Sequence, residues 1–259
     1  MTQRPNTLQD KVAVIAGGGK NLGALIAHGF ADAGARAIAI HYNGDASREQ
    51  AERTAAELQA KGARTLLFQG DLSVVDHVVA LFDQARAEFG AIDIAVNTVG
   101  VVIKKPILEV TEADYERSFD ANAKAAFFFI QQAGRTLADR GKIVTIVSSL
   151  LAAYTDSYAV YPGSKAPVEH YTRAASKEFG RRGISVNAIG PGPMDTPFFY
   201  GQESAESAAY HASAAALSGY SRTGLTDIRD IAPIVTFLAT DGWWITGQTL
   251  FANGGYTTR

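Results

Sequence analysis

Short runs of residues rich in Val, Ile and Ala alternate with longer helix-like segments, and this alternation constrains the fold more than any other feature. Most of the short runs are apolar throughout, which is typical of strands covered on both faces. Strands that alternate with helices predict parallel pairing through crossover helices. The predicted strands span residues 11–16, 37–41, 65–69, 92–97, 142–147, 185–189 and 249–252, and the predicted helices span 22–33, 47–61, 73–89, 112–138, 157–180 and 227–240.

This pattern predicts an α/β fold, a single-domain Rossmann-like doubly wound parallel sheet with helices on both faces. No Pro/Ser-rich linker divides the 259 residues, so one domain is expected over 1–259. One segment, at about 191–226, carries Gly, Pro, Ser and Ala in place of a strand. Because ligands bind beyond the carboxyl ends of such strands, this segment is predicted to be a substrate lid, the alternative being a disordered surface insertion.

The charge and composition of the chain limit the classes of partner that the protein is expected to bind. A net charge of -2 spread along the chain gives no electrostatic reason to expect nucleic acid. No apolar run approaches the ~20 residues that cross a membrane. The first ten residues are polar, unlike a secretory signal, and the chain has no cysteine. The histidines lack metal-ligand spacing, so no metal site is predicted. We therefore expect a soluble cytoplasmic globular protein.

A glycine-rich stretch follows the first predicted strand and opens the first predicted helix. Glycines let the backbone turn tightly and approach a pyrophosphate, whose charge a helix N-terminus stabilises. The stretch does not fit GxGxxG, but its position predicts a dinucleotide site, and the lack of GKS or GKT argues against a P-loop NTPase. The cofactor contacts expected from it are Gly17, Gly19, Lys20, Asn21, Leu22 and Gly23.

The end of the second predicted strand indicates which dinucleotide is bound. NAD enzymes carry an acid there that holds the ribose 2′-hydroxyl, whereas this chain reads His41-Tyr42-Asn43. No carboxylate would repel a 2′-phosphate, and the ammonium of Lys20 could reach one as a point charge. These residues favour NADP(H), with NAD(H) as the alternative. Lys20 could also be an ordinary solvated lysine.

The candidate catalytic residues are Tyr161 and Lys165, which share one helix face because they lie four residues apart. A tyrosine titrates near ~10, and a neighbouring cation lowers that pKa, so that the phenol exchanges a proton near neutral pH. The alternative is a packed tyrosine beside a surface lysine. Ser148 ends the preceding strand and brings a hydroxyl to the same sheet edge, with Ser149 as a second candidate.

In combination these residues resemble the short-chain dehydrogenase/reductase family over essentially the whole chain. The pieces occur in the family's order: Gly17…Gly23, Asp71-Leu72, Asn97-Thr98-Val99-Gly100, Asn122, Ser148, Tyr161…Lys165, Pro191-Gly192…Thr196 and Ile245-Thr246-Gly247-Gln248…Asn253-Gly254-Gly255. The chain departs from the family at Asn21, where a glycine is usual, but asparagine tolerates left-handed dihedral angles.

The resemblance implies the residue roles. It makes Tyr161 the acid/base, Lys165 the group that lowers its pKa and holds the nicotinamide ribose, Ser148 the donor to the substrate oxygen, and Asn122 the support of a proton-relay water. It also implies a homo-oligomer, with a tetramer favoured. The remaining implied cofactor contacts are Asp71 and Leu72 at the adenine, Asn97 and Gly100 at the floor, and Pro191, Gly192, Met194 and Thr196 at the nicotinamide end.

The predicted function is therefore that of an NADP(H)-dependent oxidoreductase that transfers a hydride between nicotinamide and a carbonyl or secondary alcohol. The loop at 19–23 with His41-Tyr42 is similar to the NADPH-using pteridine reductase branch, and the remainder is similar to 3-oxoacyl-carrier-protein reductase-like members. A pteridine-type C=N reductase is thus one alternative. A non-catalytic dinucleotide sensor is another, against which the retained Tyr161 and Lys165 argue.

Overall fold

Seven parallel strands form one sheet in the order β3-β2-β1-β4-β5-β6-β7, in a computed structural model that describes residues 7–257. The ends of the predicted domain, 1–6 and 258–259, and most of the polar chain start lie outside the described residues. The strands are β1 Val12–Ala16, β2 Ala37–Tyr42, β3 Arg64–Gln69, β4 Ile92–Asn97, β5 Leu137–Ile146, β6 Ser185–Pro191 and β7 Thr249–Ala252.

The strand order confirms the predicted doubly wound sheet. From β1 the chain winds outward through β2 to β3, then returns to the other side of β1 and continues from β4 to β7. The reversal lies between β1 and β4, where Ala16 pairs in register with Asn97. Sheets of this kind bind their ligands at such a reversal, beyond the carboxyl ends of the strands. The topology therefore places a candidate site directly after Ala16 and Asn97.

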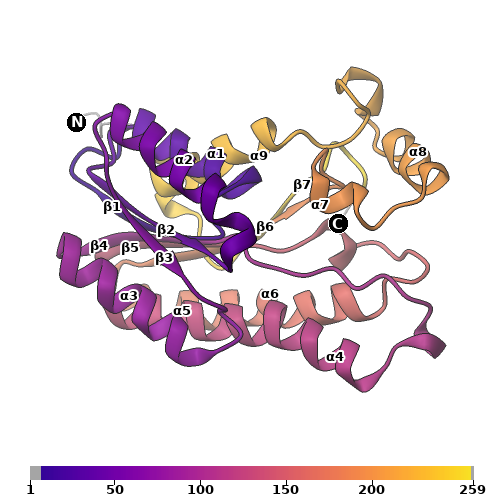
Figure 1. The fold of residues 1–259 in the computed structure, drawn as a ribbon, viewed down its shortest axis with the longest axis horizontal. Coiled ribbons are helices and arrows are strands. Elements are labelled where there is room, and N and C mark those ends of the chain that lie inside the picture. Colours follow the sequence, from indigo (N-terminus) through magenta and orange to yellow (C-terminus); the bar gives the residue numbers. More distant parts are fainter. Residues whose placement is uncertain (1–6, 258–259) are drawn as a thin grey trace.

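Two layers of helices cover the sheet (Figure 1). One face carries α1 Asn21–Asp32, α2 Arg48–Ala60 and α9 Ile228–Ala239; the other carries α3 Val75–Phe89, α4 Glu112–Phe119, α5 Ala125–Thr136 and α6 Val160–Phe179. Each layer encloses its own apolar core, the first around Phe30 of α1 and the second around Phe82 and Phe129. Short 3-10 turns lie at Asp45–Ser47, Ile107–Glu109, Ser149–Leu151, Gly180–Arg182, Ser218–Tyr220 and Asp241–Trp244.

The predicted helix at 112–138 is wrong in two respects. Between α4 and α5 the chain forms a π-helical segment, Asp120–Lys124, and β5 already begins at Leu137. A π-helical turn holds one residue more than an α-helical turn and often occurs at functional sites. Here it contains Asn122, whose side chain is buried. Apolar periodicity across the whole stretch did not reveal this change of register.

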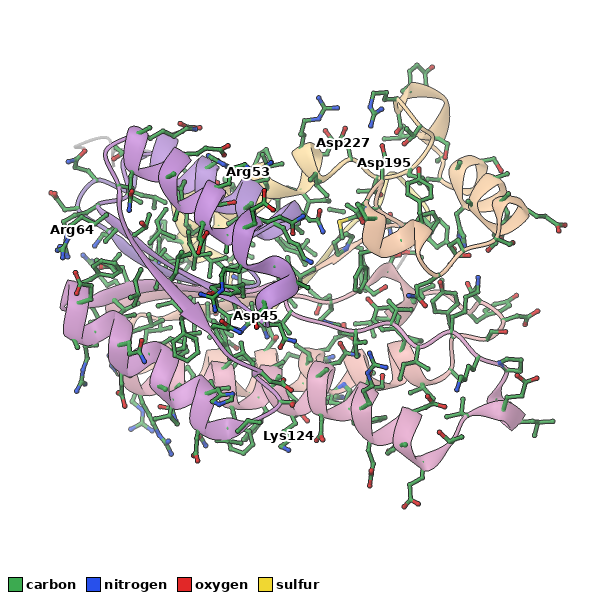
Figure 2. The ribbon with its side chains drawn as sticks, viewed as in Figure 1. Asp45, Arg53, Arg64, Lys124, Asp195 and Asp227 are labelled. Carbon is green, nitrogen blue, oxygen red and sulfur yellow. The ribbon has the colours of Figure 1, made fainter. Side chains whose placement is uncertain are left out.

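The 191–226 segment holds two helices, α7 Pro197–Tyr200 and α8 Ala205–Ala214, which stand beyond the end of β6 (Figure 1). An isolated β-bridge pairs Met194 with Thr226, near the two ends of the segment. Asp195 and Asp227, which follow these residues, therefore lie on adjacent stretches of backbone (Figure 2). The segment is therefore structured at its base. Within the described part of the chain, no helix combines the length and apolarity that crossing a membrane requires.

Candidate active site

A cleft of about 680 Å³ opens at the reversal between β1 and β4. Its size is within the ~300–1,000 Å³ usual for small-molecule and cofactor sites. The glycine loop after β1, the ends of β2, β4 and β5, the first turns of α6 and the start of the 191–226 segment all contribute to its wall. The sequence-predicted residues that line it are Gly17, Gly19, Lys20, Asn21, Leu22, Gly23, His41, Tyr42, Asn43, Asp71, Gly100, Tyr161, Lys165, Met194 and Thr196.

The remaining predicted residues lie close by but do not line this cleft. Leu72 is buried in the apolar core on the α3 face, not in the wall expected to meet adenine. Asn97 and Asn122 are buried beneath the floor. Ser148, Pro191 and Gly192 line a second, smaller pocket that adjoins the cleft.

The glycine loop turns tightly after β1, and its residues line the cleft. Gly17 has a φ of +75°, a left-handed conformation that favours glycine. A Cβ on Gly23 would lie 2.1 Å from the Gly17 carbonyl oxygen, so only glycine allows the helix to start so close to the turn. Asn21 replaces the usual second glycine and has a φ of +49°, as expected of an asparagine there.

The buried side chain of His41 stabilises the glycine loop through hydrogen bonds. Its Nδ1 accepts a hydrogen bond from the Gly17 N–H at 3.0 Å, and its Nε2 lies 2.7 Å from the Gly70 carbonyl oxygen. The first contact needs an unprotonated Nδ1 and the second a protonated Nε2, so the ring is neutral. Burial lowers the pKa of His41 to about 4, which keeps it neutral at physiological pH. His41 therefore supports the loop and carries no charge toward a phosphate.

This arrangement predicts a pH effect on stability. The folded-state pKa of about 4 lies below the ordinary 6.5, so the unfolded chain takes up the proton first and stability falls as the pH drops from 6.5 to 4. Between pH 7 and pH 4 we expect wild type to lose about 3 kcal/mol more unfolding free energy than His41→Gln, which does not titrate. Urea unfolding at both pH values measures the difference, and parallel losses would contradict the prediction.

Lys20 has a partner that the sequence reasoning missed. Its ammonium lies 3.0 Å from the Ser47 hydroxyl, and both residues line the cleft beside Tyr42 and Asn43. Ser47 precedes α2 but makes no side-chain cap hydrogen bond, so its hydroxyl is directed to Lys20. A serine just before a helix suggests a cap, and no local signal distinguishes a cap from a cleft residue. Arg117 is a further cationic residue in the cleft wall, in addition to Lys20 and Lys165, and the sequence did not indicate it.

Lys165 lies at the floor of the cleft on α6, almost fully buried. Its ammonium donates to the carbonyl oxygens of Val99 and Ile146, each at 3.1 Å. A Cβ on Gly100 would lie 2.8 Å from both the Lys165 ammonium and the Asn122 Oδ1, so a glycine is needed where these groups converge. Burial lowers the pKa of Lys165 to about 8.

Asn122 connects the chain after β4 to the helices on that face of the sheet through side-chain hydrogen bonds. Its Oδ1 accepts from the Val101 N–H and its Nδ2 donates to the Val101 carbonyl, both at 2.9 Å. The Nδ2 also lies 2.9 Å from the Ser164 hydroxyl, one residue before Lys165. The amide therefore connects the loop over Lys165 with α6, and its position depends on the π-helical turn.

Tyr161 stands where the cleft meets the smaller pocket, and it lines both. Its hydroxyl is hydrogen-bonded to Ser148, which lowers its pKa, but burial has the larger and opposite effect and raises the pKa to about 12. With this raised pKa, Tyr161 is a protonated donor. The lowering of its pKa by Lys165 stays a prediction. Ser148, not Ser149, is the serine in contact with Tyr161.

The smaller pocket, called here the inner pocket, measures about 90 Å³. Aromatic and aliphatic side chains dominate its wall, and much of that wall comes from the 191–226 segment. Its lining residues are Val102, Val147, Ser148, Ser149, Leu150, Tyr158, Tyr161, Pro191, Gly192, Pro193, Met194, Thr196, Phe198, Phe199, Gln202 and His211. A group that enters this pocket meets the Ser148 and Tyr161 hydroxyls next to the cleft.

Known proteins resemble this chain along nearly its full length. A family model described as enoyl-(acyl carrier protein) reductase matches residues 17–257. A short chain dehydrogenase/reductase of Aspergillus novofumigatus is 32% identical, over 97% of this chain and 97% of that protein. A hydroxynaphthalene reductase-like protein of Metarhizium brunneum is 34% identical, over 99% and 98%. A protein of Burkholderia cenocepacia, crystallised with bound NADP, is 61% identical with a TM-score of 0.97, over 100% of this chain and 97% of that chain.

Proposed function

The chain belongs to the short-chain dehydrogenase/reductase family, and on this basis we propose that it is an NADP(H)-dependent oxidoreductase acting on a carbonyl or secondary alcohol. The observation that carries the proposal is the position of Tyr161, which contacts Ser148 and borders both the cleft and the inner pocket. A proton donor thus stands between a space of cofactor size and a space that takes a small carbonyl group.

The residues of the cleft fit a dinucleotide. The loop from Gly17 to Gly23 leads into the N-terminus of α1, which favours the negative charge of a pyrophosphate. Lys20 and Ser47 lie beside Asn43, at the end of β2 where no carboxylate is present to repel a 2′-phosphate. The Burkholderia cenocepacia protein was crystallised with NADP. These features support NADP(H) over NAD(H).

In ketone reduction, an NADPH held in the cleft would supply the hydride that the carbonyl carbon accepts. As negative charge develops on the carbonyl oxygen, the hydroxyls of Ser148 and Tyr161 donate hydrogen bonds to it. Tyr161 then delivers its proton to that oxygen. Lys165 keeps a positive charge beneath the site, held by the Val99 and Ile146 carbonyls. Asn122 positions the loop that covers this ammonium.

We propose the 191–226 segment as the substrate lid, because it provides Phe198, Phe199, Gln202 and His211 to the inner pocket.

We further propose a homo-oligomer, with the tetramer favoured over the dimer. Exposed apolar side chains support association: Trp244 is 81% and Phe237 46% exposed. Size-exclusion chromatography with light scattering tests the oligomeric state. The cytoplasmic location remains a prediction.

A substrate panel tests the reaction class. Oxidation of NADPH is followed at the nicotinamide absorbance with ketones, 3-oxoacyl thioesters, enoyl thioesters and dihydropteridines. Turnover of ketones supports the proposal, whereas turnover of dihydropteridines alone would favour the C=N reductase. If wild type turned over none of the panel yet bound NADPH tightly, the dinucleotide-sensing function would replace the proposed one.

Lys20→Ala tests the cofactor preference. We expect NADPH affinity to fall about tenfold, the scale of one charge-assisted hydrogen bond, while NADH affinity changes little because NADH lacks the 2′-phosphate. Fluorescence titration measures both affinities. Lys61→Ala is the matched control, since Lys61 pairs with Asp32 at the surface. Equal losses for both cofactors, or tighter binding of NADH by wild type, would contradict the assignment.

A further inference from the structure

Two side chains, Leu150 and Tyr158, separate the inner pocket from a second space called here the outer cleft. The outer cleft measures about 590 Å³ and is lined by Pro106, Ile107, Leu150, residues 153–159 and Pro162. Leu150 and Tyr158 line both spaces. The inner pocket, at about 90 Å³, is well below the ~300 Å³ at which pockets begin to hold drug-sized ligands. The partition therefore limits the space beside Tyr161 on the side of the inner pocket.

Tyr158 is held in this partition by a charged group from the 191–226 segment. Its hydroxyl donates a hydrogen bond to the carboxylate of Glu203, whose side chain has 0% exposed surface. The ammonium of Lys104 also contacts this carboxylate and lies 5.2 Å from the centre of the Tyr158 ring. Hydroxyl and ring are thus both restrained, and Tyr158 itself is only 7% exposed.

Glu203 remains ionised in this setting. Burial acts to raise the pKa of Glu203, but hydrogen bonds from Lys104, Ser207 and Tyr158 together hold it below its ordinary value. A buried carboxylate with several donors resists displacement, because leaving those donors unpaired is costly. The same contacts join the chain after β4, the chain before α6 and the 191–226 segment.

The orientation of the Tyr158 side chain determines whether its ring or its hydroxyl faces the inner pocket. Its ring lies against that of Tyr161, with centroids 6.3 Å apart and planes at 61°. Because the Tyr158 hydroxyl is hydrogen-bonded to Glu203, the side chain presents its ring, and no free hydroxyl, to the inner pocket. Tyr158 therefore acts as an apolar wall, in contrast to Tyr161, whose hydroxyl is directed to Ser148.

We propose that Tyr158 is a specificity-determining residue, positioned by Glu203, whose ring closes the inner pocket toward the outer cleft and limits the size of the carbonyl substrate. The proposal rests on the proposed function, because it concerns the substrate of the same site. Removing the ring joins the two spaces and admits a larger uncharged ketone. Glu203 acts through Tyr158 as a positioning residue and touches no reacting atom.

Tyr158→Ala tests the wall directly with two uncharged ketones, cyclohexanone and 2-acetylnaphthalene. We expect the ratio of kcat/KM, large ketone over small, to rise about tenfold or more, the scale on which pocket size discriminates substrates. Tyr115→Ala, which removes a 50% exposed tyrosine of α4 that lines neither space, should leave the ratio unchanged. An unchanged ratio in Tyr158→Ala, or equal losses for both ketones, would overturn the proposal. If Tyr158→Ala does not fold, Tyr158→Val serves in its place.

A double-mutant cycle tests the positioning by Glu203. Tyr158→Phe and Glu203→Met each delete the hydrogen bond from one side, and each should raise the ratio by roughly threefold. The double variant should shift it no further, because coupled residues are not additive. Glu203→Gln keeps an acceptor and should retain the wild-type ratio, as should Glu178→Met at an exposed glutamate of α6. An additive double variant would show that Glu203 does not act through Tyr158.

One measurement separates this proposal from the proposed function. If wild type reduces neither ketone with NADPH, the proposed ketone reductase function is rejected. The role of the Tyr158 ring as a wall can still be tested by binding, without turnover. Binding of 2-acetylnaphthalene, followed by calorimetry in the presence of NADP⁺, should then be about tenfold tighter in Tyr158→Ala than in wild type. Equal affinity would reject the partition irrespective of the reaction.

Discussion

Replacing Tyr161 by phenylalanine is expected to lower turnover of a ketone about 100-fold or more, the scale of a lost acid/base group. The ring keeps its packing, so the thermal midpoint and NADPH affinity should remain near wild type. What disappears is the hydroxyl that bonds Ser148 and donates the proton. Steady-state kinetics with NADPH, together with a cofactor titration, separate the two effects.

Two neighbouring tyrosines provide the controls. Tyr154 is 99% exposed, and its phenylalanine variant should be fully active. Tyr158→Phe should keep its turnover and change only its preference among ketones, because the hydroxyl of Tyr158 is bonded to Glu203. If Tyr161→Phe remained active while Tyr158→Phe lost activity, the acid would be Tyr158. If neither loss occurred with any substrate that wild type converts, the assignment of a tyrosine acid would be wrong.

Lys165→Met should reduce turnover on the same scale, about 100-fold, and also weaken NADPH binding about tenfold. Methionine fills similar space but removes the charge and both donors to the Val99 and Ile146 carbonyls. Tyr161→Phe, in contrast, is expected to leave cofactor affinity intact. Lys61→Met, at a surface ion pair with Asp32, is the matched control and should change neither property.

The same lysine predicts a pH profile. Burial lowers the pKa of Lys165 to about 8, so its charge is present below that pH and is lost as the pH rises through it. Tyr161, with a pKa of about 12, remains a proton donor over this range. Wild-type kcat/KM for ketone reduction should therefore fall above about pH 8, whereas Lys165→Met should lack this decline. A flat wild-type profile from pH 7 to pH 9.5 would contradict the role of the Lys165 charge.

Periodicity and turn chemistry in the sequence were sufficient to predict the architecture. Apolar runs of strand length, separated by helical segments, predicted all seven strands and the doubly wound sheet, because these signals depend on neighbours within a few residues. For the same reason the glycine turn before Asn21 and the four-residue spacing of Tyr161 and Lys165 could be interpreted locally. Parallel pairing then places the strand ends, and with them the candidate site, at one edge.

The features that only the tertiary structure decided depend on burial and on contacts between distant parts of the chain. His41 lines the cleft, as expected of a cofactor contact, but its support of Gly17 and its neutral state follow from its burial in the folded core. The pKa of Tyr161 rises for the same reason. The π-helical turn at Asn122 and the pairing of Tyr158 with Glu203 join segments whose separation in sequence carries no periodic signal. Local pattern thus determined the framework and the proposed pair Tyr161 and Lys165, whereas folding determined the protonation states, the supporting residues and the size of the pocket.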